Sequence, residues 1–194
     1  MNYYIAEQKI EKNGGRTAWS KARADAERIC ADQGFEEISV RPAAEDRVNA
    51  ALGQKIRGHF TMARIWREAL RPLGPGDGLF IQLPAIHNCL FLAGILRRVR
   101  RRGVRIVGLV HDLETLRMSL DRTVGLRSRW RMHAEETGVL RLCDKLIVHN
   151  GKMAERLAAQ GLSREKLVPL GLFDYLVDKE KYVNTVNAFI DRTL

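Results

Sequence analysis

The sequence predicts an α/β fold: a doubly wound, Rossmann-like parallel sheet in a single domain, with an added C-terminal amphipathic helix. The first observation is that short β-like runs alternate along the chain with helix-like segments. The second is that several runs are continuously apolar, as expected for strands that are covered on both faces. The third is size and composition, because 194 residues, 45% of them hydrophobic, can bury a real core.

Six runs are expected to be strands, because each is short and apolar and is followed by a helical segment or a loop. In chain order they are Tyr3–Ala6, Glu37–Val40, Gly78–Leu83, Arg105–Val110, Lys145–His149 and Lys166–Pro169.

Helical apolar spacing fills most of the segments between these runs. The first helix has an apolar stripe from Trp19 to Cys30, and Gly34 is its expected C-cap. The second ends where Arg71-Pro72 and the turn-rich GPGDG interrupt the pattern. The helices that we expect after the first one are Val48–Leu70, Ile86–Arg102, Glu136–Leu142 and Gly151–Gln160.

Two segments depart from this alternation. Leu113–Thr137 is long, rich in arginine and without a clean strand, and we expect an irregular loop there. Residues 179–194 have the pattern of a separate amphipathic helix. Its apolar face consists of Tyr182, Val183, Val186, Phe189 and Ile190.

The net charge of +10, from 33 basic and 23 acidic residues, favours an anionic partner: nucleic acid, lipid headgroups or a phosphorylated substrate. No apolar stretch has the length of a membrane-spanning helix, and the N-terminus lacks the layout of a signal peptide. Cys30, Cys89 and Cys143 lie far apart in apolar contexts, which indicates buried thiols. We therefore expect a cytoplasmic protein that can also lie peripherally at the inner face of the membrane.

Ligands of open α/β sheets bind beyond the carboxyl ends of the strands, so the loops there carry the candidate site. After the first strand, Asn13-Gly14-Gly15 allows a tight turn whose amides can cradle a phosphate, with charge from Arg16 and a helix cap from Thr17. An ordinary loop with an N-cap explains the same residues equally well. The glycine fingerprints of dinucleotide-binding and P-loop proteins are absent.

The third and fifth strands are followed by polar residues of similar kind. Gln82 and Pro84 end the third strand, and His87 is expected to begin the next helix on the cleft side, where it is either a ligand contact or an exposed histidine at a helix cap. Asn150 follows the fifth strand, where capping the next helix is the favoured role and a ligand contact the alternative.

The fourth strand ends in His111-Asp112. A metal site requires further ligands, and neither H-x-x-x-H nor C-x-x-C spacing occurs, so we expect no metal. Proton transfer, substrate contact and structural closure of the strand remain open. Because adjacent strand residues point to opposite faces, a direct His–Asp dyad requires the chain to have turned.

Arginine gathers in two places. The run Arg97–Arg102 is expected at a helix C-terminus, where cations complement the helix dipole. The second group suits a membrane surface or a polyanionic acceptor, whereas no signature of a nucleic-acid-binding fold supports specific nucleic-acid binding. It consists of Arg127, Arg129, Trp130 and Arg131.

The stretches GDGLFIQLPAIHN, GVRIVGLVHDLETLR and LCDKLIVHNGKMAERLAAQGL, in this order, resemble a bacterial glycosyltransferase family of GT-B fold, the β-1,6-galactofuranosyltransferase-like and glucosyltransferase-3-like enzymes. Its members show a strand ending in Gln-x-Pro, a strand ending in His-Asp and a strand followed by a helix with Lys-Met. The resemblance covers roughly residues 1–178 in order and spacing.

The resemblance implies transfer of a hexosyl or galactofuranosyl group from a nucleotide sugar, usually a UDP-sugar, to a glycan, glycoprotein or lipid-linked acceptor, without a metal or other cofactor. It implies that residues 1–178 are the acceptor-side domain and that 179–194 pack back on it, with the donor domain missing and the chain inactive alone. The cleft residues that it implies are Asn13, Gly14, Gly15, Gln82, Pro84, His111, Asp112 and Asn150.

Other readings remain open beside this one. A non-catalytic basic module that binds nucleic acid or anionic membrane would share the charge, and a small nucleotide-binding enzyme of another Rossmann type would share the fold. An exposed apolar face on the tail helix can also mediate a homodimer if the helix does not dock within the chain.

Overall fold

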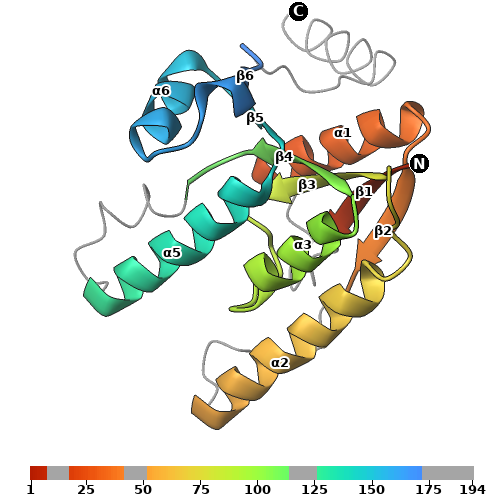
Figure 1. The fold of residues 1–194 in the computed structure, drawn as a ribbon, viewed down its shortest axis with the longest axis vertical. Helices are drawn as coiled ribbons and strands as arrows, with labels where there is room; N and C mark the ends of the chain where they lie inside the picture. Colours follow the sequence, from red (N-terminus) through yellow and green to blue (C-terminus); the bar gives the residue numbers. More distant parts are fainter. Residues whose placement is uncertain (8–17, 42–51, 114–125, 172–194) are drawn as a thin grey trace, which may run out of the picture.

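The computed structural model describes residues 1–7, 18–41, 52–113 and 126–171. They contain a six-stranded parallel sheet with the order β2-β1-β3-β4-β5-β6, which confirms the predicted fold class (Figure 1). All six predicted strands are present, with ends that shift by one residue at most. The strands are β1 (Asn2–Glu7), β2 (Glu36–Val40), β3 (Gly78–Leu83), β4 (Arg105–Val110), β5 (Lys145–Val148) and β6 (Leu167–Pro169).

The described helices follow the strands as the alternation predicts, and within these residues none is long and apolar enough to cross a membrane. The predicted tail helix, 179–194, lies outside the described residues. The helices are α1 (Ala18–Asp32), α2 (Leu52–Ala69), α3 (Leu92–Arg101), α5 (Leu126–Leu142), α6 (Gly151–Ala159) and the 3₁₀ turn η1 (Arg164–Lys166).

The expectation of an irregular loop across Leu113–Thr137 is wrong for its second half, because α5 begins at Leu126. No Gly or Pro interrupts residues 126–137, and Arg, Met, Ala and Glu there have high helix propensity. The arginines obscured this, since they leave no apolar stripe to mark a helix. In the fold, α5 packs closely on α3: a Cβ built on Gly138 would lie 3.4 Å from Cβ of Ala93.

The predicted helix Ile86–Arg102 is also too long, because α3 begins only at Leu92. Residues 84–91 form a turn-rich loop that is held by other elements. The amides of Ile86 and His87 donate to the carboxylate of Glu7, and Nε1 of Trp66 donates to the carbonyl of His87 at 2.9 Å. These partners come from β1 and α2, so the local pattern could not reveal them.

The strand order reverses between β1 and β3. The chain moves outward from β1 to β2, returns through α2 to β3 on the other side of β1, and then continues in one direction to β6. A crevice at the carboxyl ends of β1 and β3 is therefore the expected ligand site of this topology.

The main core lies between the sheet and the helices α2, α3 and α5 (Figure 1). Trp66 is fully buried in it, and Gly108 lets β4 approach its neighbours, since a Cβ there would lie 2.9 Å from Leu146 and 3.1 Å from Sγ of Cys143. The three cysteines are buried free thiols, as predicted. On the opposite face, α1 covers a smaller cluster that contains Tyr4, Ala6 and Cys30.

Candidate functional site

A buried ion pair lies at the point where the strand order reverses. Glu7, the last residue of β1, is 3.4 Å from the guanidinium of Arg23 in α1, and their side chains are only 3% and 5% exposed. The two oxygens of Glu7 also accept the amides of Ile86 and His87 at 2.9 and 2.8 Å. Burial raises the pKa of Glu7, although the two amides and the Arg23 charge favour the carboxylate.

Arg23 joins this pair to the next loop, because its guanidinium donates to the carbonyl of Pro84. One ion pair thus connects β1, α1 and the loop after β3. The pair therefore fixes the positions of these elements relative to one another, at the edge where this topology is expected to bind ligands.

Gln82 extends the network from β3 to β4. Its side chain is fully buried, and Nε2 donates to the carbonyl of Arg23 and to the Glu27 carboxylate at 3.2 and 3.3 Å. Its Oε1 therefore faces Nε2 of His111 at 2.6 Å as an acceptor. This arrangement places the imidazole proton on Nε2 and leaves Nδ1 of neutral His111 as a hydrogen-bond acceptor.

His111 and His149 lie side by side at the carboxyl edge of the sheet, with ring centroids 5.9 Å apart. Val110 pairs with Val148 in register, so the histidines that follow them are brought together. Burial, followed by the charges of Arg23 and His149, lowers the pKa of His111 to about 4. His111 is therefore neutral at pH 7.

The ends of the two strands contain a sequence signal for this pairing. The strands end in Leu-Val-His111-Asp and Ile-Val-His149-Asn, so the same Val-His step recurs at two strand ends. In a parallel sheet with aligned ends, such a repeat predicts neighbouring side chains. Glu7, Arg23 and Glu27 gave no such local signal, because their partners are distant in sequence.

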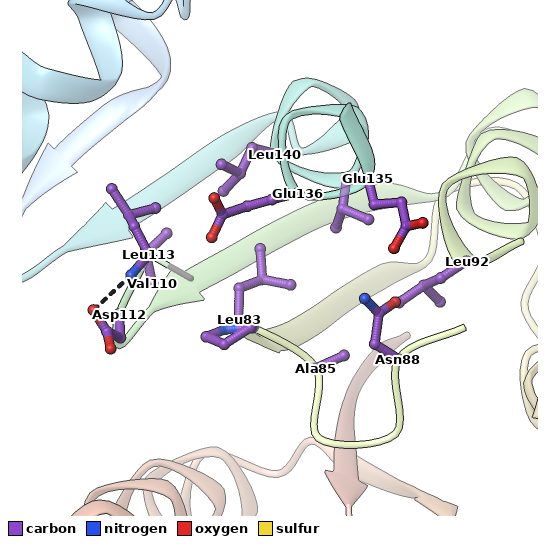
Figure 2. A pocket seen from close by; sticks show the side chains of 12 residues that line it. Leu83, Ala85, Asn88, Leu92, Val110, Asp112, Leu113, Glu135, Glu136 and Leu140 are labelled. Atoms are coloured by element: carbon purple, nitrogen blue, oxygen red, sulfur yellow. Dashed lines mark hydrogen bonds between the residues drawn. The ribbon is translucent and has the colours of Figure 1, made fainter. Parts of the chain in front are cut away.

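Asp112 faces a different space from His111. Its carboxylate accepts the amide of Leu113 at 2.7 Å, and it lines a pocket of about 120 Å³ between the sheet and α5. Figure 2 shows Glu135 extending from α5 toward Asn88, whereas the carboxylate of Glu136 points toward Val110 and Leu113. The adjacent His111 and Asp112 therefore belong to two neighbouring environments and not to one dyad. Among the described residues, no three His, Cys, Asp or Glu side chains are arranged to hold a metal ion.

The other predicted site residues are distributed unevenly. Pro84 lines the pocket that contains Asp112, Glu135 and Glu136, which we call the acidic pocket, and the Leu83–Pro84 peptide bond is cis. His87 does not begin a helix as expected. Its backbone amide donates to Glu7, and its backbone carbonyl accepts from Trp66. Asn150 caps α6, since its Oδ1 accepts the amide of Met153 at 2.9 Å.

Two predicted groups cannot be placed at the site. The loop Asn13, Gly14, Gly15, Arg16 and Thr17 lies outside the described residues. Arg127, Arg129, Trp130 and Arg131 fall in the helical backbone of α5, and their side chains are outside the described part.

Glu27 gives the network a pH dependence. Burial, followed by the charge of Glu37, raises its pKa from 4.5 to about 7. The folded state therefore holds its proton more tightly than the unfolded state, and this stabilisation is lost as the pH rises from about 4.5 through about 7. We expect Glu27→Gln to raise Tm by roughly a few degrees at pH of about 8 and to leave it unchanged near pH 4.5.

Thermal unfolding at both pH values measures this effect. Glu155→Gln, on the exposed surface of α6, is the matched control and should change Tm equally little at both. A Glu27→Gln variant whose Tm change does not depend on pH would contradict the raised pKa.

No curated protein matches the chain. Residues 2–172 match the sequence model of the family described as glucosyltransferase 3-like, N-terminal domain, and the chain belongs to this family.

Proposed function

We propose that this chain is the acceptor-side domain of a GT-B glycosyltransferase that uses a nucleotide sugar. The observation that carries the proposal is the pair of imidazoles at the carboxyl edge of β4 and β5, of which His111 is hydrogen-bonded to the buried side chain of Gln82. Membership of the glucosyltransferase 3-like family supports transfer of a glycosyl group as the reaction class. The proposed acceptors are a glycan, a glycoprotein or a lipid-linked sugar.

His111 is the proposed contact to the acceptor. Its Nδ1 can accept a hydrogen bond from a sugar hydroxyl, because Gln82 holds the proton on Nε2. With a pKa of about 4, His111 is a weak base, so in this proposal it orients the hydroxyl more than it removes the proton. Gln82 is a positioning residue, since it is fully buried and acts through His111.

The carboxylates of Asp112, Glu135 and Glu136 form the second part of the proposed site. They line the pocket beside α5 together with the amide of Asn88, and such groups bind sugar hydroxyls as acceptors and donors. Asp112, at the end of β4, is the proposed contact to further hydroxyls of the acceptor in this second environment.

The proposed co-substrate is a UDP-sugar, held mainly by a second Rossmann-like domain with which this one forms the cleft. Backbone amides at helix starts on this side would stabilise the leaving diphosphate. Residues 179–194 would pack back on the domain through their apolar face.

Titration of the 194-residue chain with nucleotides and with glycans tests whether it binds the acceptor and not the donor. By calorimetry, UDP and UDP-glucose are expected to show no tight, saturable binding, because the main nucleotide contacts belong to the other domain. In NMR spectra, glycan acceptors should shift the resonances of His111 and His149. Tight UDP binding by this chain alone would contradict the assignment to the acceptor side.

A further inference from the structure

The helices α2 and α3 present an unusual combination of exposed side chains. Ile56 and Phe60 of α2 are 49% and 58% exposed, and Leu90, just before α3, is 38% exposed. Large apolar side chains with this much exposure are costly in water when they are contiguous, and contiguous apolar surfaces mark interaction sites.

These apolar side chains form one surface. Ile56 and Phe60 are four residues apart on α2 and so share a helix face. The ring of Phe60 lies 5.0 Å from that of Phe91, whose neighbour in the chain is Leu90. We call this set the apolar end of the α2–α3 surface.

A basic groove continues from the apolar end. Its volume is about 360 Å³, and Leu90 and Phe91 form part of its wall, which joins it directly to the apolar end. Of the residues that the structure describes, four arginines and no acidic residue line it: Arg67 from α2 and Arg97, Arg98 and Arg101 from α3.

These four arginines differ from the other basic residues at the end of α3. Arg100 pairs with Asp144 at 2.8 Å, and Arg102 donates to the carbonyls of Leu70 and Arg71. Within the described part of the chain, none of the four groove arginines forms an ion pair. Their charge is thus available to an external anion.

We propose that the α2–α3 surface docks on an anionic lipid bilayer. The apolar end would enter the boundary between headgroups and acyl chains, while the groove arginines contact lipid phosphates. An arginine keeps its charge at any physiological pH and binds phosphate oxygens with two parallel hydrogen bonds. A polyanion without an apolar layer, such as duplex nucleic acid, would leave Ile56 and Leu90 in water.

The docked orientation brings the bilayer to the candidate site. The first turns of α2 and the loop 84–91 both follow carboxyl ends of strands, so the apolar end lies on the same edge of the sheet as His111. The loop itself lines both places, with Asn88 in the acidic pocket and Phe91 in the groove. Presentation of a lipid-linked acceptor to the site rests on the proposed function, whereas docking itself does not.

Co-sedimentation with vesicles tests the docking. The 194-residue chain is mixed with vesicles of phosphatidylcholine alone or with added phosphatidylglycerol, at low and at high salt. We expect binding to the anionic vesicles that weakens with salt. Phe60→Ser and the double variant Arg97→Glu/Arg98→Glu should each weaken it by about tenfold or more.

Matched control variants show whether vesicle binding depends on this surface or on charge and apolar exposure anywhere on the protein. Ile29→Ser removes a similarly exposed apolar residue on α1, and Arg156→Glu/Arg164→Glu makes the same charge change near α6. Both controls should bind the anionic vesicles like the wild type.

Three results would overturn the proposal. The first is that the chain does not bind anionic vesicles, and the second is that the control variants lose as much vesicle binding as the surface variants. The third is that Phe60→Ser binds the vesicles fully and duplex DNA displaces the protein from them. The last two would assign the affinity to net charge or to a polyanion surface. The vesicle assay contains no sugar or nucleotide, so a negative result would contradict the docking and not the proposed glycosyl transfer. In the same way, a negative result in the UDP and glycan titrations would contradict the proposed function and not the docking.

Discussion

Replacing Glu7 by alanine is expected to lower the free energy of unfolding by about 3–5 kcal/mol. The variant would remove the carboxylate that pairs with the guanidinium of Arg23, a side chain that is only 5% exposed. It would also remove the acceptor of the Ile86 and His87 amides. Urea denaturation of the wild type and the variant measures the change directly.

Two further variants make this result specific. Glu37→Ala removes an exposed carboxylate that accepts the hydroxyl of Tyr4 at 3.1 Å, and should cost less than about 1 kcal/mol. Glu7→Gln keeps one acceptor and the shape of the side chain, so its cost should fall between the two. A loss below about 1 kcal/mol in Glu7→Ala would mean that the pair is not the connection we describe.

In a full-length glycosyltransferase that contains this domain, His111→Ala is expected to lower kcat/KM by about 10²-fold or more. The reason is the loss of the acceptor atom Nδ1 from the edge of the cleft, while Gln82 and the ion pair remain in place. The fold should be retained, because the main cost to stability is one buried Gln82 oxygen without a donor, about 1–3 kcal/mol. Initial rates and Tm, measured together, separate the two effects.

His133→Ala is the matched control, since His133 is exposed on α5. It should leave both the rate and Tm unchanged. Asp112→Ala should also reduce the rate, because it removes a carboxylate from the pocket beside α5. If His111→Ala and Asp112→Ala lose Tm in proportion to rate, the strand end has only a structural role.

The protonation of His111 in NMR spectra offers a second check on its environment. Because its pKa is lowered to about 4, the wild-type imidazole should stay neutral as the pH falls from 7 to about 5. The C–H proton resonances of His111 in NMR spectra should therefore show no titration in this range. A titration centred near 6.5 would contradict the burial and hydrogen bonding assigned to the ring.

The strands were the easiest elements to predict, and the helix ends the hardest. A run such as Arg105–Val110 is apolar throughout because both faces of a parallel strand are covered, and this property is local. The start of α3 at Leu92 was missed because Glu7, far away in the chain, binds the amides of Ile86 and His87. The start of α5 was missed because propensity, and not an apolar stripe, makes that helix.

The sequence by itself determined the order of strands and helices along the chain, the strand ends that carry His111 and Asn150, and the membership of the family. Local composition and spacing contain that information. Only the tertiary structure decided that His111 meets Gln82 and His149, that Asp112 faces α5, and that Phe60 meets Phe91 beside the groove arginines. The reason is that these contacts depend on strand register and helix packing, which bring together residues that are distant in sequence.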